Sequence, residues 1–212
     1  YLADGETVVQ IYSVEISDDH GGTVAQDITI TFTGGNDTPT LTSAVTAGVI
    51  SEDGVLSASG MIAFADADLA DTHTVDITAA AGGYLGLFQA IVADDATADG
   101  AGQIGWTFTV DNALLQTLAQ GETRTQTYTV TVSDAASGQI SQDITITITG
   151  ANDTPTIHAS LVATNQGMEI SGQLTANDVD GDTVTFTAAT NPQHGTLLLQ
   201  SSGVYTYVPA ND

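Results

Sequence analysis

Residues 123–155 read TRTQTYTVTVSDAASGQISQDITITITGANDTP and contain two segments in which apolar residues alternate strictly with threonine. The apolar members of these two segments are Tyr128, Val130, Val132, Ile144, Ile146 and Ile148. A period of two places alternate side chains on opposite faces of a strand, and threonine, valine, isoleucine and tyrosine favour strands. The sequence therefore predicts half-buried antiparallel strands in this region.

The same pattern occurs at residues 7–39, which read TVVQIYSVEISDDHGGTVAQDITITFTGGNDTP and align with residues 123–155 without a gap. Over the longer alignment of residues 1–40 with 117–156, 24 of the 40 positions are identical. The chain therefore contains an internal repeat, and each copy ends in T-G-[GA]-N-D-T-P. We expect the strands of the first copy to be half-buried as well.

A weaker similarity follows each copy: GMIAFADADLADTHTVDI begins at Gly60, and the related GQLTANDVDGDTVTFTA begins at Gly172. Clusters of glycine, aspartate and asparagine interrupt the apolar segments about every ten residues, as in β-sandwiches. We expect an all-β fold, with one helical turn at Ala113–Ala119. The predicted organisation is the C-terminal part of one module, one complete module and the N-terminal part of a third, at residues 1–39, 40–155 and 156–212.

The charge composition excludes several functions. The 212 residues include 26 acidic residues and a single basic one, Arg124, for a formal net charge of −25. Such a chain has no basic patch for nucleic acid, and no apolar run approaches the roughly 18 residues of a membrane helix. It also lacks cysteine, which excludes disulfides, thiolate metal sites and cysteine nucleophiles. The acidic residues, 21 of which are aspartate, repel one another because only one basic residue is present. Either bound cations or a solvated, halophile-like surface must offset this repulsion.

The acidic residues recur in turns, in the linkers before Pro39 and Pro155, in a glycine-flanked loop and in two D-x-D pairs. Calcium prefers about six to eight oxygen ligands, and a D-x-D pair in an extended segment places both carboxylates on one face. We therefore expect Ca²⁺ at each junction, held by a turn aspartate, a linker and a downstream D-x-D pair. The candidate ligands are Asp18, Asn36, Asp37, Glu52, Asp53, Asp66, Asp68, Asp134, Asn152, Asp153, Asp178, Asp180 and Asp182.

Other site motifs do not fit. The D-V-D-G-D segment at Asp178 resembles the start of an EF-hand loop, but its glycine comes too early and the twelfth position is Ala189. The four histidines show no H-x-x-x-H spacing. His73, which is near Asp71 and Asp76, is expected to be a solvated loop histidine, with a transition-metal site as the alternative. No nucleophile elbow, phosphate loop or dinucleotide motif is present, so we expect no enzymatic activity.

The stretch 40–155, with its V-[ST]-V-[ST]-D…[IV]-T-I-T-G-x-N-D-x-P ending, resembles a VCBS repeat, a cadherin-like or immunoglobulin-like module of very large secreted bacterial proteins. Residues 1–39 resemble the end of another copy, and residues 156–212 the start of a related cadherin-like module. The resemblance implies elongated, calcium-stiffened arrays in RTX-type adhesins and biofilm proteins on the bacterial cell surface, usually secreted by a type I system. The positions that match the family's linker and D-x-D motifs are Asn36, Asp37, Asp66, Asp68, Asn152, Asp153, Asp178 and Asp180.

We therefore expect a calcium-binding structural extender of a bacterial adhesin or extracellular fibre, with neighbouring modules as partners and surface glycans or host or matrix polymers bound by other domains. One alternative is a carbohydrate- or ligand-binding module, which needs exposed aromatic residues, whereas Trp106 is expected in the core. The second alternative comes from the ending V-P-A-N-D at 208–212, which aligns with Val110–Ala113. Identical chains would then complement one another head to tail as a filament, unless the sequence is a segment of a longer array.

Overall fold

The structure is a computed structural model that describes residues 2–158 and 161–210. The last two residues of the predicted V-P-A-N-D alignment, Asn211 and Asp212, lie outside this range. The described chain consists of strands, turns and one 3-10 helix, η1 (Asn112–Leu114), which is shorter than the helical segment expected there. The prediction of an all-β fold is confirmed. The chain divides into two compact units, made of residues 1–50, 55–110 and 125–147, and of residues 51–54, 111–124 and 148–212.

The strands form several small sheets, in the orders β1-β2, β4-β10-β9-β6, β3-β5-β8-β7, β11-β13 and β12-β15-β14. In chain order the strands are β1 (Thr7–Ser17), β2 (Thr23–Thr33), β3 (Thr40–Ala44), β4 (Ala47–Ser51), β5 (Ser57–Ala65), β6 (Thr74–Ala79), β7 (Leu87–Asp94), β8 (Ala101–Thr109), β9 (Thr123–Ser133), β10 (Gln139–Thr149), β11 (Thr156–Ile157), β12 (Ile170–Gln173), β13 (Ala176–Asn177), β14 (Gly195–Leu199) and β15 (Val204–Pro209). Within residues 2–158 and 161–210, no helix has the length and apolar character needed to cross a membrane.

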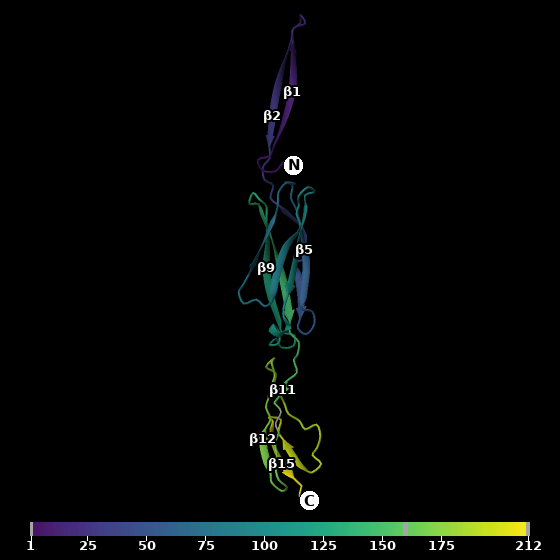
Figure 1. The fold of residues 1–212 in the computed structure, drawn as a ribbon, viewed down its shortest axis with the longest axis vertical. Coiled ribbons are helices and arrows are strands. Elements are labelled where there is room, and N and C mark those ends of the chain that lie inside the picture. The colour runs from purple at the N-terminus through teal and green to yellow at the C-terminus, as the bar shows by residue number, and fades with distance from the viewer. Residues whose placement is uncertain (1, 159–160, 211–212) are drawn as a thin grey trace. The chain divides into compact units, whose positions relative to one another are not determined.

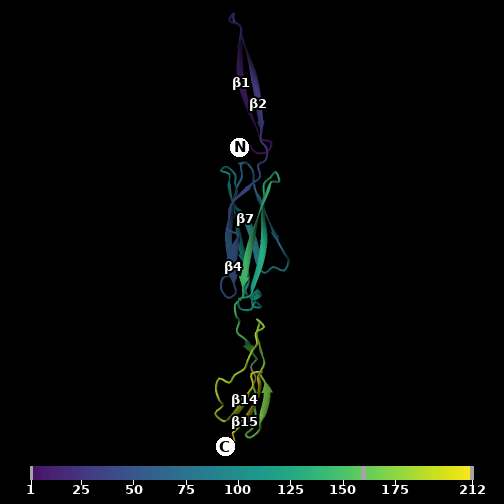
Figure 2. The ribbon, with the colours of Figure 1, turned by 180° about the vertical axis from the view of Figure 1, so that it is seen from behind.

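The two four-stranded sheets of the middle region pack face to face as a β-sandwich. Figures 1 and 2 show them from opposite sides, with β5 and β9 labelled in one view and β4 and β7 in the other. Phe88 on β7 stacks on Tyr128 of β9 with ring centroids 4.4 Å apart, which joins the two sheets. Trp106 on β8 is 1% exposed, and its indole N–H donates to the carbonyl of Val45 at 2.9 Å. Trp106 is therefore a core residue, as the sequence predicts.

A glycine under an aromatic ring recurs in both units. On β5, Gly60 pairs with Trp106 of β8, and a Cβ atom at residue 60 would lie 2.6 Å from the indole ring. On β12, Gly172 pairs with Tyr205 of β15, and a Cβ atom at residue 172 would lie 2.5 Å from the phenol oxygen. Both positions need glycine because the ring lies flat over the backbone. The β12–β15 pair of the second unit therefore repeats the register of the β5–β8 pair.

The β1–β2 hairpin differs from the half-buried pair expected from the sequence. The two strands pair in an unbroken antiparallel register, from Thr7 with Thr33 to Ser17 with Thr23 (Figure 1). Their apolar side chains remain exposed, including Tyr12 at 52% and Phe32 at 48%. The related strands β9 and β10 are flanked by β6 and β4, whereas β1 and β2 pair only with each other in the described part of the chain. The alternation thus predicted the strands correctly but not their burial.

Candidate metal centre

The first acidic cluster, formed by Asn36, Asp37, Asp66, Asp68, Asp71 and Asp134, lies where the linker before β3 meets the loop after β5. The backbone N–H of Asp37 donates to Oδ2 of Asp68 at 2.6 Å, and the N–H of Asp68 donates to Oδ1 of Asp66 at 2.8 Å. The second bond makes residues 66–68 a turn instead of the extended segment predicted, because an aspartate side chain readily accepts from the N–H two residues on. Asp68 is fully buried, and its Oδ1 has no hydrogen-bond partner among the described residues.

Asp134 enters the first acidic cluster from the turn between β9 and β10. Its Oδ1 accepts the backbone N–H groups of Ala136 at 2.9 Å and Gly138 at 2.7 Å, which fixes the carboxylate. Its Oδ2 accepts the side-chain amide of Asn36 at 3.2 Å. A Cβ atom at residue 138 would overlap this Oδ2, so the turn needs glycine there. The turn therefore presents one oxygen of Asp134 to the linker.

Asp71 belongs to the first acidic cluster but was not among the predicted ligands. Its backbone N–H donates to the carbonyl of Asp68 at 2.9 Å, and its buried Oδ2 has no hydrogen-bond partner in the described chain. Burial raises the pKa of the Asp71 carboxyl, and repulsion by Asp68 and Asp134 raises this pKa further. The alignment of D-x-D-x-x-D with the D-x-D-x-D segment ending at Asp182 is the sequence signal that would have identified it.

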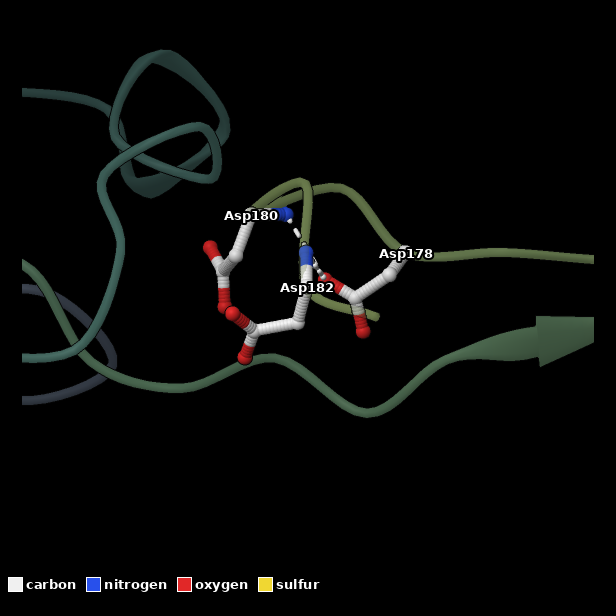
Figure 3. Close-up of side chains that lie close together, drawn as sticks. All are labelled: Asp178, Asp180 and Asp182. Carbon is white, nitrogen blue, oxygen red and sulfur yellow. Dashed lines mark hydrogen bonds between the residues drawn. The ribbon is translucent and has the colours of Figure 1, made fainter. Parts of the chain in front are cut away.

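The second acidic cluster, formed by Asp53, Asp153, Asp178, Asp180 and Asp182, repeats this geometry in the second unit. The N–H of Asp153 donates to Oδ2 of Asp180 at 2.7 Å. The N–H groups of Asp180 and Asp182 donate to Oδ1 of Asp178 at 3.0 and 3.2 Å (Figure 3). One carboxylate oxygen from each of these three aspartates lies within 4.8 Å of the others. The buried Oδ1 of Asp180, like that of Asp68, has no hydrogen-bond partner within the residues described.

Repulsion also acts within the second acidic cluster. Burial raises the pKa of Asp153, and the carboxylates of Asp180 and Asp53 raise it further. Asp53 follows β4 and exchanges two hydrogen bonds with Asn112, from its N–H to the amide oxygen at 2.9 Å and from the amide nitrogen to its Oδ1 at 2.6 Å. Its φ of 54° lies in the left-handed region, which aspartate tolerates better than most residues. The pairing with Asn112 therefore holds Asp53 in place.

Glu52 supports the linker beside the second acidic cluster. Its side chain is buried, with Oε1 accepting the side-chain amide of Gln116 at 3.0 Å and Oε2 accepting the backbone N–H of Ala151 at 2.9 Å. Both carboxylate oxygens are therefore engaged by protein donors. This arrangement assigns Glu52 to fixing the start of the linker, while its predicted role as a metal ligand stays a prediction.

Two other predicted ligands make no hydrogen bond to the clustered carboxylates in the described structure. Asn152 is exposed, and its side-chain amide donates to the carbonyl of the next residue at 2.9 Å. Asp18 lies in the turn between β1 and β2, where its Oδ1 accepts the N–H groups of His20 at 2.9 Å and Gly22 at 2.7 Å. Asp134 accepts two N–H groups of its turn in the same way. Asp134 also accepts the side-chain amide of Asn36, whereas the described contacts of Asp18 include no asparagine. Asp18 therefore belongs to neither acidic cluster.

His73 is buried, with 6% exposure, and is not the solvated loop histidine predicted from the sequence. Its Nδ1 lies 2.6 Å from Oδ1 of Asp95, and its Nε2 lies 3.0 Å from Oδ2 of Asp66. Burial, the largest influence, lowers the pKa of His73, but its contacts with these two carboxylates outweigh burial and the pKa is raised. The partners are thus not Asp71 and Asp76, the acidic residues nearest in sequence, because the fold brings Asp95 in from the end of β7.

The side chains of both acidic clusters are of the kind that Ca²⁺ prefers, and in the second cluster the oxygens of Asp178, Asp180 and Asp182 also converge within 4.8 Å. Each cluster offers aspartate oxygens, and the first adds the buried side-chain oxygen of Asn36, all of which are hard donors that calcium prefers. Buried polar atoms without partners are costly, so the two Oδ1 atoms of Asp68 and Asp180 favour a cation or water beside them. The single arginine, Arg124, is half exposed. Its Nε lies 3.6 Å from Oε1 of Glu122, which is outside both clusters, so this arginine does not neutralise the clustered carboxylates.

In calcium-free solution, we expect the free energy of unfolding to rise as the pH falls from the folded-state pKa of His73, which lies above 6.5, toward 3.8, the ordinary pKa of the aspartates. The folded-state pKa values of Asp71 and Asp153 lie above 3.8, so their repulsion is fully present above the folded-state pKa and is relieved as the pH falls through it. The raised pKa of His73 acts in the same direction, since its stabilisation is complete below 6.5 and is lost as the pH rises through the folded-state pKa. Urea unfolding in chelator, followed by the fluorescence of Trp106, measures this dependence.

The variant Asp71→Asn serves as the test of this pH dependence, and Asp143→Asn as its control. Asp143 lies on β10 outside both acidic clusters and accepts the hydroxyl of Thr129 at 2.7 Å. We expect the Asp71 variant to flatten the dependence and the Asp143 variant to leave it unchanged. A stability that falls on acidification over this range contradicts the prediction.

Residues 152–212 match the family model described as Bacterial Ig domain, and this range contains Asp153, Asp178, Asp180 and Asp182. No curated protein sequence matches the chain. The similar solved structures include protocadherin gamma B2 extracellular cadherin domains 1–5, at 17% identity and a TM-score of 0.45, covering 96% of this chain and 40% of that chain. Human CDH23 EC21-23 matches at 17% identity and a TM-score of 0.41, and the match covers 96% of this chain and 65% of that chain.

The titin domains z1z2, solved in complex with telethonin, match at 13% identity and a TM-score of 0.37, covering 84% of this chain and 83% of that one. The present chain thus spans less than two thirds of both cadherin chains. The chain is an all-β protein, and its residues 152–212 are similar to a bacterial Ig domain.

Proposed function

We propose that this chain is a calcium-binding structural segment of a bacterial cell-surface adhesin or extracellular fibre, in which Ca²⁺ fixes each linker to the β-strand module that follows it. The observation that carries the proposal is the equivalence of Asp68 and Asp180. Each accepts the N–H of a linker aspartate through Oδ2, at 2.6 and 2.7 Å, and each keeps a buried Oδ1 without a hydrogen-bond partner in the described chain. A feature repeated at equivalent positions indicates a common ligand.

Two sets of residues would hold the ions. In the first acidic cluster they are Asn36, Asp37, Asp66, Asp68, Asp71 and Asp134, and in the second they are Asp53, Asp153, Asp178, Asp180 and Asp182. When bound, calcium supplies the positive charge that converts repulsion among these carboxylates into attraction. The backbone N–H bonds of Asp37 and Asp153 orient the linkers toward the clusters, and Pro39 and Pro155 restrict φ just beyond them.

The wider assignment is to VCBS-type repeats of RTX-type adhesins and biofilm proteins, extracellular and secreted by a type I system. The repeated T-G-[GA]-N-D-T-P ending and the bacterial Ig match at 152–212 support it. The proposed modules are residues 1–39, 40–155 and 156–212, and the proposed partners are neighbouring modules or identical chains head to tail. The exposed apolar side chains of β1 and β2 are suited to such a partner.

Two features of the middle sandwich favour a structural, non-enzymatic role over carbohydrate binding. A sugar-binding face needs exposed aromatic rings, but most rings of this region lie in its core. Tyr84 is half-buried against Tyr128, and the others are no more than 7% exposed, namely Phe64, Phe88, Trp106, Phe108 and Tyr128. The buried carboxylates of Asp68 and Glu52 accept backbone N–H groups of the linkers, so these acids hold the linkers in place.

Calorimetric titration with Ca²⁺ tests the proposal. We expect the wild-type protein to bind calcium at both acidic clusters, Asp68→Asn to lose binding at the first and Asp180→Asn to lose it at the second. The control Asp143→Asn removes an equal charge from β10 and should bind as the wild type does. A wild-type protein that binds no calcium, or cluster variants that bind as many ions as the control, would overturn the proposal.

A further inference from the structure

His73 is held rigidly on three sides beside the first acidic cluster. Its Nδ1 contacts Oδ1 of Asp95 at 2.6 Å, and its backbone N–H donates to Oδ2 of the same carboxylate at 3.2 Å. Its ring packs against Phe64 with the ring centroids 4.7 Å apart. A Cβ atom at residue 102 would overlap the Phe64 ring, so Gly102 makes room for this packing. The imidazole is therefore fixed by Asp95 and by the core of the sandwich.

The second ring nitrogen of His73, Nε2, holds the carboxylate of Asp66. The Nε2 of His73 lies 3.0 Å from Oδ2 of Asp66, and both side chains are fully buried. The other oxygen of Asp66, Oδ1, accepts the N–H of Asp68 at 2.8 Å. Each oxygen of Asp66 thus has one hydrogen-bond partner and retains a lone pair for a cation, and the bond to the N–H of Asp68 sets the course of the backbone at Asp68. The Oδ1 of Asp68 is the oxygen left without a hydrogen-bond partner in the described residues.

The second acidic cluster achieves the same turn without a histidine. There Oδ1 of Asp178 accepts two backbone N–H groups, from Asp180 and Asp182. The shorter D-x-D-x-D segment brings the second N–H to the carboxylate, whereas the first cluster has one more residue between Asp68 and Asp71. The described contacts of Asp178 include no imidazole. The two clusters therefore differ in how their first aspartate is oriented.

We propose that His73 is a positioning residue of the first acidic cluster, which orients Asp66 and through it the calcium-binding carboxylate of Asp68, with Asp95 as its anchor. This inference rests on the proposed calcium function. Residues that hydrogen-bond to a metal ligand typically change metal affinity by about 10- to 100-fold when they are removed. No such effect is expected at the second acidic cluster.

The experiment compares calcium affinities of the two clusters in the full chain. The Asp180→Asn background reports the first cluster alone, and the Asp68→Asn background reports the second. His73→Phe keeps an aromatic ring against Phe64 but removes both nitrogen contacts. We expect about a 10- to 100-fold weaker calcium affinity at the first cluster and a change of less than about twofold at the second. His73→Gln, which retains an amide donor, should recover part of the loss.

Three outcomes would overturn the inference. An unchanged first-cluster affinity in His73→Phe, even with a lower unfolding temperature, would assign His73 to packing alone. An equal loss of affinity at both clusters would indicate a general effect on the fold. Absence of calcium binding in the wild-type chain would overturn the proposed function together with this inference. If His73→Phe does not fold, Asp95→Asn, which weakens only the anchor, should lower the first-cluster affinity by a smaller factor, and an unchanged affinity there counts against the role.

Discussion

Addition of Ca²⁺ to the chelated protein is expected to stabilise the folded state by about 2.7 kcal/mol for each site at a hundredfold excess of calcium over its dissociation constant. The expectation rests on ions that bind the folded clusters and not the unfolded chain. In the folded chain, the linker N–H bonds to Asp68 and Asp180 bring carboxylates together that repel one another, as the raised pKa values of Asp71 and Asp153 indicate. Chemical unfolding in chelator, in calcium and in magnesium measures the effect.

Single and double variants measure how much of this stabilisation comes from each acidic cluster. Asp68→Asn and Asp180→Asn should each remove the increment of one cluster, and the double variant should remove both. The two clusters share no residue, and independent sites contribute nearly additively, so the two losses should sum. The control Asp143→Asn should keep the full calcium response. A response of the same size in magnesium, or one that survives in the double variant, would show that the acids form only a solvated, screened surface.

The strands were the part of the fold that could be predicted from the sequence, because alternation is a local signal. Tyr128, Val130 and Val132 occupy β9 and are buried as their spacing requires. The same spacing in β2 gives Ile30 and Phe32, which are exposed. Burial depends on which strands lie opposite, and that information is not contained in the strand itself.

Part of the candidate site was also predictable from repetition along the chain. Because Asn36-Asp37 and Asp66-x-Asp68 recur downstream, the alignment selected the residues that the fold brings together at the first acidic cluster. The turn at Asp66 was not foreseen, since alternation says nothing of a side chain that accepts the backbone N–H two residues further on.

Contacts between distant positions could not be predicted. His73 meets Asp95, 22 residues away, and Glu52 meets Ala151, 99 residues away. Each pair depends on the order of strands in the sheets, which no motif in a single sequence encodes. The acidity of Glu52 predicts a metal ligand, a role that stays a prediction, whereas its hydrogen bonds to Gln116 and Ala151 could not be predicted.

Replacement of Trp106 by alanine is expected to cost about 3–5 kcal/mol of folded stability, from lost packing and the cavity left behind. Trp106 is 1% exposed and stacks near Phe88, with ring centroids 5.7 Å apart. Gly60 lies directly under the ring, so no side chain there can move in to fill the space. The carbonyl of Val45 also loses its indole donor, which adds about 1–3 kcal/mol if no water replaces it. Urea unfolding of the calcium-loaded protein measures the loss.

The neighbouring Thr107 provides the matched control for this result. It follows Trp106 on β8 but faces solvent, so Thr107→Ala should change stability by less than about 0.5 kcal/mol. Trp106→Phe should lie between the two, because it keeps a ring near Phe88 and loses the bond to Val45. If Trp106 were instead a sugar-stacking residue, its removal would abolish glycan binding at little cost in stability. A small effect of Trp106→Ala on unfolding would therefore contradict its place in the core and restore the carbohydrate-binding alternative.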